Sequence, residues 1–206
     1  MRIDTLELGE LRANCHIIDC GNGLCAAADI GGDPEELLRF LEQHDLTLKA
    51  ILLTHGHYDH IGGVEAVREA TGAEVFIHEK DAEMLTDAFL NLAAQITRSP
   101  FRQVGAYTTV TDGEKITVGE NTFTVLHTPG HTSGSVCYLT GDVMLAGDTL
   151  FRGSIGRTDL GGDVGEMRAS LRMLRELEGE YTVYSGHGMK TTLNTERRTN
   201  PYMRSV

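Results

Sequence analysis

Four side chains that commonly bind metal ions lie within six residues, in the segment His55-Gly56-His57-Tyr58-Asp59-His60. Imidazole and carboxylate together suit a borderline divalent cation such as zinc, iron or manganese. In an extended backbone His55 and His57 point the same way and can hold one ion. Asp59 and His60 follow where the chain turns and can face a second ion, and Gly56 is expected to let the backbone turn between the two pairs. A lone histidine is more often structural, but this clustering predicts a metal site.

Three later segments each place one ligand-type residue beside a glycine after an apolar stretch: Gly130-His131, Gly147-Asp148 and Gly186-His187. Binding sites on α/β sheets usually lie at the carboxyl ends of strands. Each segment alone is a weak signal. Together with the first cluster they give five histidines and two aspartates on four consecutive strand-end loops.

The segments that must position these loops have the patterns of strands and helices. Apolar, turn-bounded stretches predict strands near residues 3–9, 14–20, 24–30, 48–53, 74–78, 115–118, 121–127, 135–139, 143–145 and 181–185. Helices are expected from Pro34 with Asp33 as N-cap, from Ile61 to about Ala70, and from about Asp163 to Leu177. The last of these carries an apolar stripe made of Val164, Met167, Leu171, Leu174 and Leu177.

The order of these elements predicts one mixed α/β domain. Two rounds of strands, each followed by helix, indicate a two-sheet core with helices on both outer faces. Residues 80–105 form a mixed helical and loop excursion, and a terminal helix carries Glu196. The 206 residues contain no repeat or linker and suit a single domain.

Composition narrows the class of protein. The 18 basic and 30 acidic residues give a net charge of −12, which argues against a nucleic-acid partner. No apolar run is long enough to cross a bilayer, and the charged N-terminal stretch does not have the pattern of a signal peptide, so a cytoplasmic location without membrane association is expected. The 4 cysteines contain no Cys-x-x-Cys pair and are expected to be buried or inert.

The His-x-His-x-Asp-His motif, followed by His131, Asp148 and His187 in that order, resembles the metallo-β-lactamase-fold hydrolases over nearly the whole chain. The resemblance implies a four-layer αββα sandwich with two divalent metal ions at one edge, zinc first and iron or manganese as alternatives. By this resemblance His55, His57 and His131 hold one ion, Asp59, His60 and His187 hold the other, and Asp148 bridges both.

Finer features of the chain resemble the short, single-domain glyoxalase II-like group within that family. The stretch from Leu150 to Leu160 and the stretch from Gly186 to Thr192 are similar to its loops. Longer glyoxalase II enzymes carry a C-terminal helical domain that binds glutathione. Only 19 residues follow His187, so residues 1–206 are expected to form one domain without that extension, which leaves the means of glutathione recognition open.

The expected activity is metal-dependent hydrolysis of a small-molecule thioester, S-lactoylglutathione or a related acylthiol, by a hydroxide that bridges the metals. Asp59 and Asp148 would fix the metals and accept a hydrogen bond from the bridging water, as catalytic residues. Arg152, Arg157 and Lys190 are near the motif loops and could meet a carboxylate of the substrate, with surface charge as the alternative. Tyr58 could line the entrance or simply pack.

Other activities compete with this expectation. Persulfide dioxygenase with a single iron, and lactone hydrolase, belong to the same family. A metal-binding domain without turnover is the non-enzymatic alternative. β-Lactamase activity is disfavoured, because β-lactamases usually carry Cys or Ser where this chain has Asp148 and are exported. The sequence does not define the metal or the oligomeric state.

Overall fold

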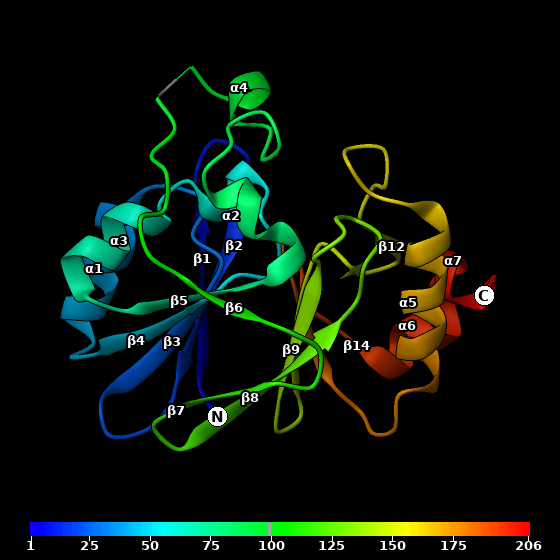
Figure 1. Ribbon diagram of the computed structural model, residues 1–206. Coiled ribbons are helices and arrows are strands. Elements are labelled where there is room, and N and C mark those ends of the chain that lie inside the picture. Colours follow the sequence, from blue (N-terminus) through cyan, green and yellow to red (C-terminus); the bar gives the residue numbers. More distant parts are fainter. Residues whose placement is uncertain (99) are drawn as a thin grey trace.

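The computed structural model describes residues 1–98 and 100–206 and contains two six-stranded sheets packed face to face. Helices cover the outer face of each sheet, so the layers run helix, sheet, sheet, helix (Figure 1). The αββα sandwich predicted from the sequence is confirmed.

The first sheet has the order β1-β2-β3-β4-β5-β6. Its first three strands are antiparallel, and β3 through β6 are parallel. The strands are β1 (Ile3–Leu8), β2 (Ala13–Asp19), β3 (Leu24–Ala28), β4 (Thr47–Leu52), β5 (Glu74–His78) and β6 (Thr108–Val110). The parallel part explains why β4 reads as an apolar run, because strands covered on both faces carry few polar side chains.

The second sheet has the order β14-β13-β10-β9-β8-β7. It is antiparallel except for the pair β10–β13. Its strands are β7 (Lys115–Val118), β8 (Asn121–His127), β9 (Val136–Thr140), β10 (Val143–Gly147), β13 (Thr182–Ser185) and β14 (Thr191–Thr192). A separate hairpin of β11 (Leu150–Phe151) and β12 (Ser154–Ile155) leaves the end of β10.

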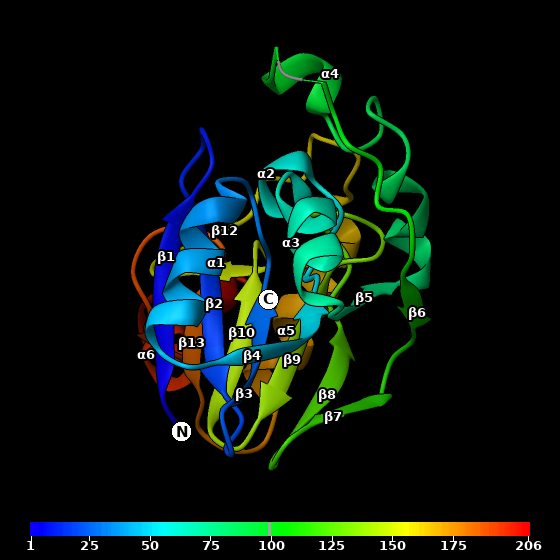
Figure 2. The same ribbon diagram turned by 90° about the vertical axis from the view of Figure 1, so that its left-hand side faces the viewer.

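Helices α1 and α3 lie outside the first sheet, and α5, α6 and α7 lie outside the second (Figure 1). Their bounds are α1 (Pro34–Gln43), α2 (Tyr58–Ile61), α3 (Val64–Thr71), α4 (Ala93–Ile96), α5 (Val164–Glu176), α6 (Leu193–Thr199) and α7 (Pro201–Arg204). A 3₁₀ helix, η1 (Glu79–Leu85), follows β5. Figure 2 shows α4 at the tip of a projection beyond the sandwich, on the same side as α2.

Three apolar clusters hold the layers together. Leu37, Ile51 and Val67 belong to the cluster between the first sheet and its helices, and Leu52 and Phe123 to the one between the two sheets. A third joins the second sheet to α5, α6 and α7. Among the described residues, no helix combines the length and apolar character needed to cross a membrane.

Some sequence predictions about the helices are wrong. Asp33 does not cap α1 with its side chain; its backbone is left-handed and its carboxylate accepts the Gly9 N–H. The helix expected from Ile61 to Ala70 is two helices, α2 and α3. In the apolar stripe of α5, Val164 is the first residue of the helix and is 61% exposed at a surface hollow, so the buried stripe begins at Met167.

Candidate metal centre

The seven predicted metal ligands meet at one edge of the sandwich, each on a loop that follows a strand. The His55–His60 segment follows β4 of the first sheet. His131 follows β8, Asp148 follows β10 and His187 follows β13, all in the second sheet. The site therefore lies across the junction of the two sheets, as the four strand-end loops predicted.

Three imidazoles form the first group. His55, His57 and His131 are all buried and place their ligand nitrogens within 4.8 Å of one another. The His57 Nδ1 and His131 Nε2 atoms are 2.9 Å apart. This spacing matches three ligands around one cation.

Asp59, His60 and His187 form the second group, with ligand atoms also within 4.8 Å of one another. Asp148 lies between the two groups. Its carboxylate oxygens are 3.5 Å from His60 Nε2, 3.6 Å from His131 Nε2 and 3.8 Å from His187 Nε2. The structure thus places Asp148 where one carboxylate can contact ions at both groups.

Three buried polar atoms at the centre of this cluster have no hydrogen-bond partner within the described chain: His55 Nε2, His60 Nε2 and Asp148 Oδ1. A buried polar atom left unpaired costs about 1–3 kcal/mol, so native proteins rarely retain several together. All three are metal-ligand atom types, and none is a sulfur. The donor set fits two hard or borderline divalent cations.

In three of the histidines, a hydrogen bond on the side of the ring away from the site determines which ring nitrogen faces the site. His131 Nδ1 donates to the Arg157 carbonyl at 2.7 Å, and His57 Nε2 donates to the Leu160 carbonyl at 3.2 Å. His60 Nδ1 donates to Asp29 Oδ2 at 2.8 Å. These partners set the tautomers so that the opposite nitrogens carry lone pairs toward the site.

Asp29, which the sequence analysis missed, organises the second group. It is 2% exposed and accepts bonds from His60 Nδ1, from the Thr54 N–H and from the Thr54 hydroxyl. It is close enough to His55 and His60 to form a third ligand group, but its oxygens already face these three donors. The signal that could have found it is its place directly after β3, the same strand-end position as the other site residues.

Asp81 in η1 ties the two halves of the site together. One oxygen accepts the Gly134 N–H at 2.7 Å, and the other accepts the Gly56 N–H at 3.0 Å and the Thr132 hydroxyl at 2.7 Å. Gly56 itself serves close packing and not the predicted tight turn, since a Cβ there would lie 2.6 Å from the Met84 Cβ.

The electrostatics of the cluster call for positive charge. Burial, reinforced by the neighbouring imidazoles, lowers the pKa values of His57 and His131 to about 4, so both are neutral. Burial would also lower the pKa of His60, but the carboxylates of Asp148, Asp29 and Asp59 raise it to about 10. The positive charge that these three carboxylates favour at His60 is the charge that a cation bound at the site would supply.

The site opens into a cavity of about 530 Å³. Ligands from both groups line it, together with Leu11, Leu92, Ile96, Phe151, Ser154, Ile155, Arg157 and Leu160. Of the four predicted substrate contacts only Arg157 lines this cavity, and its guanidinium pairs with Asp159 at 2.7 Å.

Arg152 and Lys190 line a neighbouring hollow of about 460 Å³, on the far side of the His187 loop. Arg152 contacts the Met189 sulfur at 3.8 Å, and the Lys190 ammonium lies 5.5 Å from the centre of the Tyr184 ring. Tyr58 lines neither hollow. Its ring is half-buried and packs edge-on against Phe101, because the first turn of α2 directs it away from the metal ligands.

The remaining histidines lie outside the two groups. His16 is buried and bonds Thr5 and the Ser185 carbonyl, while His44 bonds the Phe40 carbonyl. His78 and His127 stack on each other with ring centres 4.1 Å apart.

A four-layer αββα sandwich with a His/Asp cluster at one edge is the arrangement of the metallo-β-lactamase fold. The family model described as "Metallo-beta-lactamase superfamily" matches residues 8–187, and the chain belongs to that superfamily.

Similar proteins carry several functional names. Hydroxyacylglutathione hydrolase GloC from Haemophilus influenzae is 34% identical, with 100% of this chain and 99% of that protein covered. Among solved structures, the BLEG-1 B3 metallo-beta-lactamase has a TM-score of 0.92 and 39% identity, covering 98% of this chain and 99% of that one. TTHA1623 in a di-iron-bound form has a TM-score of 0.87 and 37% identity, covering 97% and 99%. ETHE1 from Myxococcus xanthus has a TM-score of 0.77 and 31% identity, covering 98% and 84%.

Proposed function

We propose that this protein hydrolyses thioesters at a dinuclear metal centre, with S-lactoylglutathione or a related acylthiol as substrate. The observation that carries the proposal is the convergence of seven ligand side chains, three with unpaired buried atoms, at the wall of an open cavity. The similarity to a hydroxyacylglutathione hydrolase along the full chain supports the thioester as substrate.

A cysteine nucleophile does not compete with this chemistry. All four cysteines are buried, and burial raises the pKa of Cys137 to about 11 and that of Cys25 to about 12. Because the thiolate is the nucleophilic form, these thiols are inert near neutral pH.

His55, His57 and His131 would hold one cation, Asp59, His60 and His187 the other, and Asp148 would contact both. When bound, such a pair supplies a water of lowered pKa and polarises a carbonyl oxygen. Asp59 and Asp148 line the cavity and are placed to accept a hydrogen bond from the attacking water. The thiolate is a good leaving group, so no strong general acid is required of the chain.

Arg157 in the cavity wall, and Arg152 and Lys190 in the neighbouring hollow, suit a thiol half that carries carboxylates. Within residues 1–98 and 100–206, no carboxylate lies within ion-pair distance of Arg152 or Lys190, although the chain is strongly acidic. Arg157 would exchange Asp159 for a substrate carboxylate, which costs little because both side chains are more than half exposed.

The test is hydrolysis of S-D-lactoylglutathione by protein reconstituted with zinc, iron or manganese, beside a metal-stripped control. Turnover that depends on metal and is lost in Asp148→Ala supports the proposal. Absence of turnover with every metal, in protein shown to be loaded, would refute it. Oxygen uptake with glutathione persulfide would then assign a dioxygenase.

β-Lactam hydrolysis is a second candidate. The sequence argued against it from Asp148, yet the BLEG-1 structure named a B3 metallo-beta-lactamase is 39% identical over nearly the whole chain. A chromogenic cephalosporin assayed with the same loaded protein separates the two activities. Cephalosporin turnover faster than thioester turnover would favour the lactamase.

A further inference from the structure

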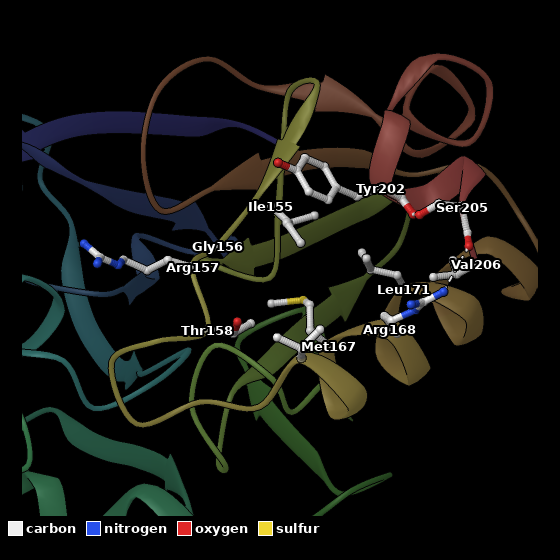
Figure 3. Close-up of a pocket in the computed structure, with 11 residues that line it drawn as sticks. Ile155, Gly156, Arg157, Thr158, Met167, Arg168, Leu171, Tyr202, Ser205 and Val206 are labelled. Atoms are coloured by element: carbon white, nitrogen blue, oxygen red, sulfur yellow. Dashed lines mark hydrogen bonds between the residues drawn. The ribbon is translucent and has the colours of Figure 1, made fainter.

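A further hollow of about 450 Å³, called the apolar hollow below, lies between the strip Ile155–Thr158, α5 and the C-terminal helix α7. Figure 3 shows Ile155, Met167, Leu171 and Tyr202 around it, with Arg168 and Val206 at its far side. Its volume lies within the range of about 300–1,000 Å³ found for small-molecule pockets.

The lining is apolar in character. Met167 and Leu171 are 1% exposed, whereas Val164 and Tyr202 leave 61% and 46% of their surfaces exposed beside it. Arg157 and Arg168 are the charged side chains of the lining. Figure 3 shows the Arg157 side chain pointing away from the apolar group, and Arg168 donates to the Ser205 carbonyl.

This hollow adjoins the metal cavity, because Ile155 and Arg157 line both. The strip that separates the two is held rigidly. The Arg157 carbonyl accepts the His131 Nδ1–H at 2.7 Å, and a Cβ at Gly156 would lie 1.9 Å from the Asp148 carbonyl oxygen. The hollow therefore keeps a fixed position relative to two predicted metal ligands.

The hollows on the two sides of the metal centre therefore differ in charge and polarity. Arg152 and Lys190, which have no carboxylate within ion-pair distance among the described residues, line the hollow beside Gly188 and Met189. Glu7 also lines this hollow, and its carboxylate pairs with Arg12. The apolar hollow lies on the His131 side, behind Ile155. A substrate with one anionic half and one apolar half matches both the hollow lined by Arg152 and Lys190 and the apolar hollow. A lactoyl group is small and polar and would leave the apolar hollow empty.

We propose that this hollow binds the apolar acyl arm of the substrate, so that thioesters with acyl chains of several methylenes are preferred over S-lactoylglutathione. This inference rests on the proposed thioester hydrolysis. The acyl chain passes over Ile155 from the reacting carbonyl and packs against the exposed faces of Val164 and Tyr202, above the buried Met167 and Leu171. The anionic thiol half stays on the cationic side.

The kinetic test compares S-acetyl-, S-butanoyl-, S-hexanoyl- and S-octanoylglutathione. Each buried methylene is expected to lower KM by up to about fourfold while kcat changes little, because the added contact is uniform binding. Tyr202→Ala should raise KM for the octanoyl substrate about five- to tenfold and leave that for the acetyl substrate unchanged. Tyr107→Ala is the matched control, since Tyr107 is a 39% exposed tyrosine that does not line the hollow.

A binding test separates this inference from the proposed reaction. S-methyl- and S-octylglutathione are thioethers that cannot be hydrolysed, so their calorimetric Kd values need no turnover. Tighter binding of the octyl compound, lost in Tyr202→Ala and in Val164→Asp, supports the subsite even where no thioester is hydrolysed. Equal Kd values for the two thioethers would overturn the subsite even where hydrolysis is confirmed. A change of oligomeric state in Tyr202→Ala without a change in Kd would also overturn it, assigning the hollow to contact between copies.

Discussion

Replacing Asp29 by Asn is expected to weaken one of the two metal sites selectively. The backbone can accept the change, because Asp29 has a φ of 56°, a left-handed conformation that Asn adopts readily. The side-chain volume is also kept. The effect must therefore come from the hydrogen bonds.

Three donors converge on the two Asp29 oxygens, and an amide cannot accept them all. If the amide nitrogen takes the place of Oδ2, His60 Nδ1 must become an acceptor, which moves the His60 proton to Nε2, the atom that faces the metal site. If the amide nitrogen takes the place of Oδ1, it faces the Thr54 N–H, and leaving that group unpaired costs about 1–3 kcal/mol.

The first arrangement removes the acceptor that orients His60, and the second leaves His60 an uncharged acceptor in place of a carboxylate, so both weaken the group of Asp59, His60 and His187. Loss of such an orienting partner typically lowers metal affinity about 10–100-fold, which corresponds to about 1.4–2.7 kcal/mol. In the other group, His57 and His131 are oriented by the Leu160 and Arg157 carbonyls. Asp29 reaches His55 only through the Thr54 hydroxyl, so this group should lose less affinity.

Titration of the metal-free protein against a chromophoric chelator resolves the two dissociation constants. Asp81→Asn is the control, because that buried carboxylate also accepts three hydrogen bonds but none from an imidazole. Both variants should lose comparable stability in urea, while only Asp29→Asn weakens one site at least tenfold. Unchanged metal affinity in Asp29→Asn, or an equal loss in Asp81→Asn, would refute the reasoning.

Three further predictions follow from individual residues. Asp148→Ala should reduce the bound metal, measured by mass spectrometry, and the turnover by the same factor. The reason is that the Asp148 carboxylate lies 3.5–3.8 Å from ligand nitrogens of both groups. Full activity would contradict the bridging role. Gly31→Ala should destabilise the fold by about 1–3 kcal/mol in urea unfolding, since its Cβ would lie 1.9 Å from the Asp59 carbonyl oxygen, and an unchanged midpoint would count against this contact. His78→Asn should reduce the loss of folding stability at acid pH. Burial lowers the pKa of His78 in the folded protein to about 4, so between about pH 6.5 and pH 4 the unfolded chain binds one more proton than the folded one. Unfolding therefore becomes easier as the pH falls through this range. Asn keeps the bond from the Lys80 N–H without titrating. The free energies of unfolding in urea at pH 7 and pH 4.5 should differ less in this variant, by about 1–3 kcal/mol, and an unchanged pH dependence would exclude His78 as the cause.

The metal centre could be predicted well from the sequence because its ligands all come directly after apolar strands. His131, Asp148 and His187 each follow a strand, and because β8, β10 and β13 run in the same direction, their carboxyl ends meet at one edge of the sheet. Asp29 has the same placement but was missed, because it lies inside the stretch 24–30 that was predicted as a strand, whereas β3 ends at Ala28. Its role depends on Thr54 and His60, contacts that no local pattern contains.

The substrate side was much less predictable. Arg152, Arg157 and Lys190 were grouped because they are near the motifs in sequence, yet they line different hollows. Tyr58 lies between two ligands but faces Phe101, because one helical residue turns a side chain by about 100° relative to its neighbour. The direction of an exposed side chain depends on packing between distant segments, and a sequence pattern carries little information about it.

The metal site joins loops from both sheets, and this has a consequence for how the molecule comes apart. His57 and His131 are 74 residues apart in the chain and lie on loops of different sheets. Separating the sheets would pull His55 and His57 away from His131, so any bound ions would have to leave before the sandwich could open. A ligand that binds only the folded state adds about 2.7 kcal/mol when present at 100 times its Kd. Metal ions bound at both groups would therefore hold the two sheets together, and the supply of metal would set the protein's resistance to proteolysis.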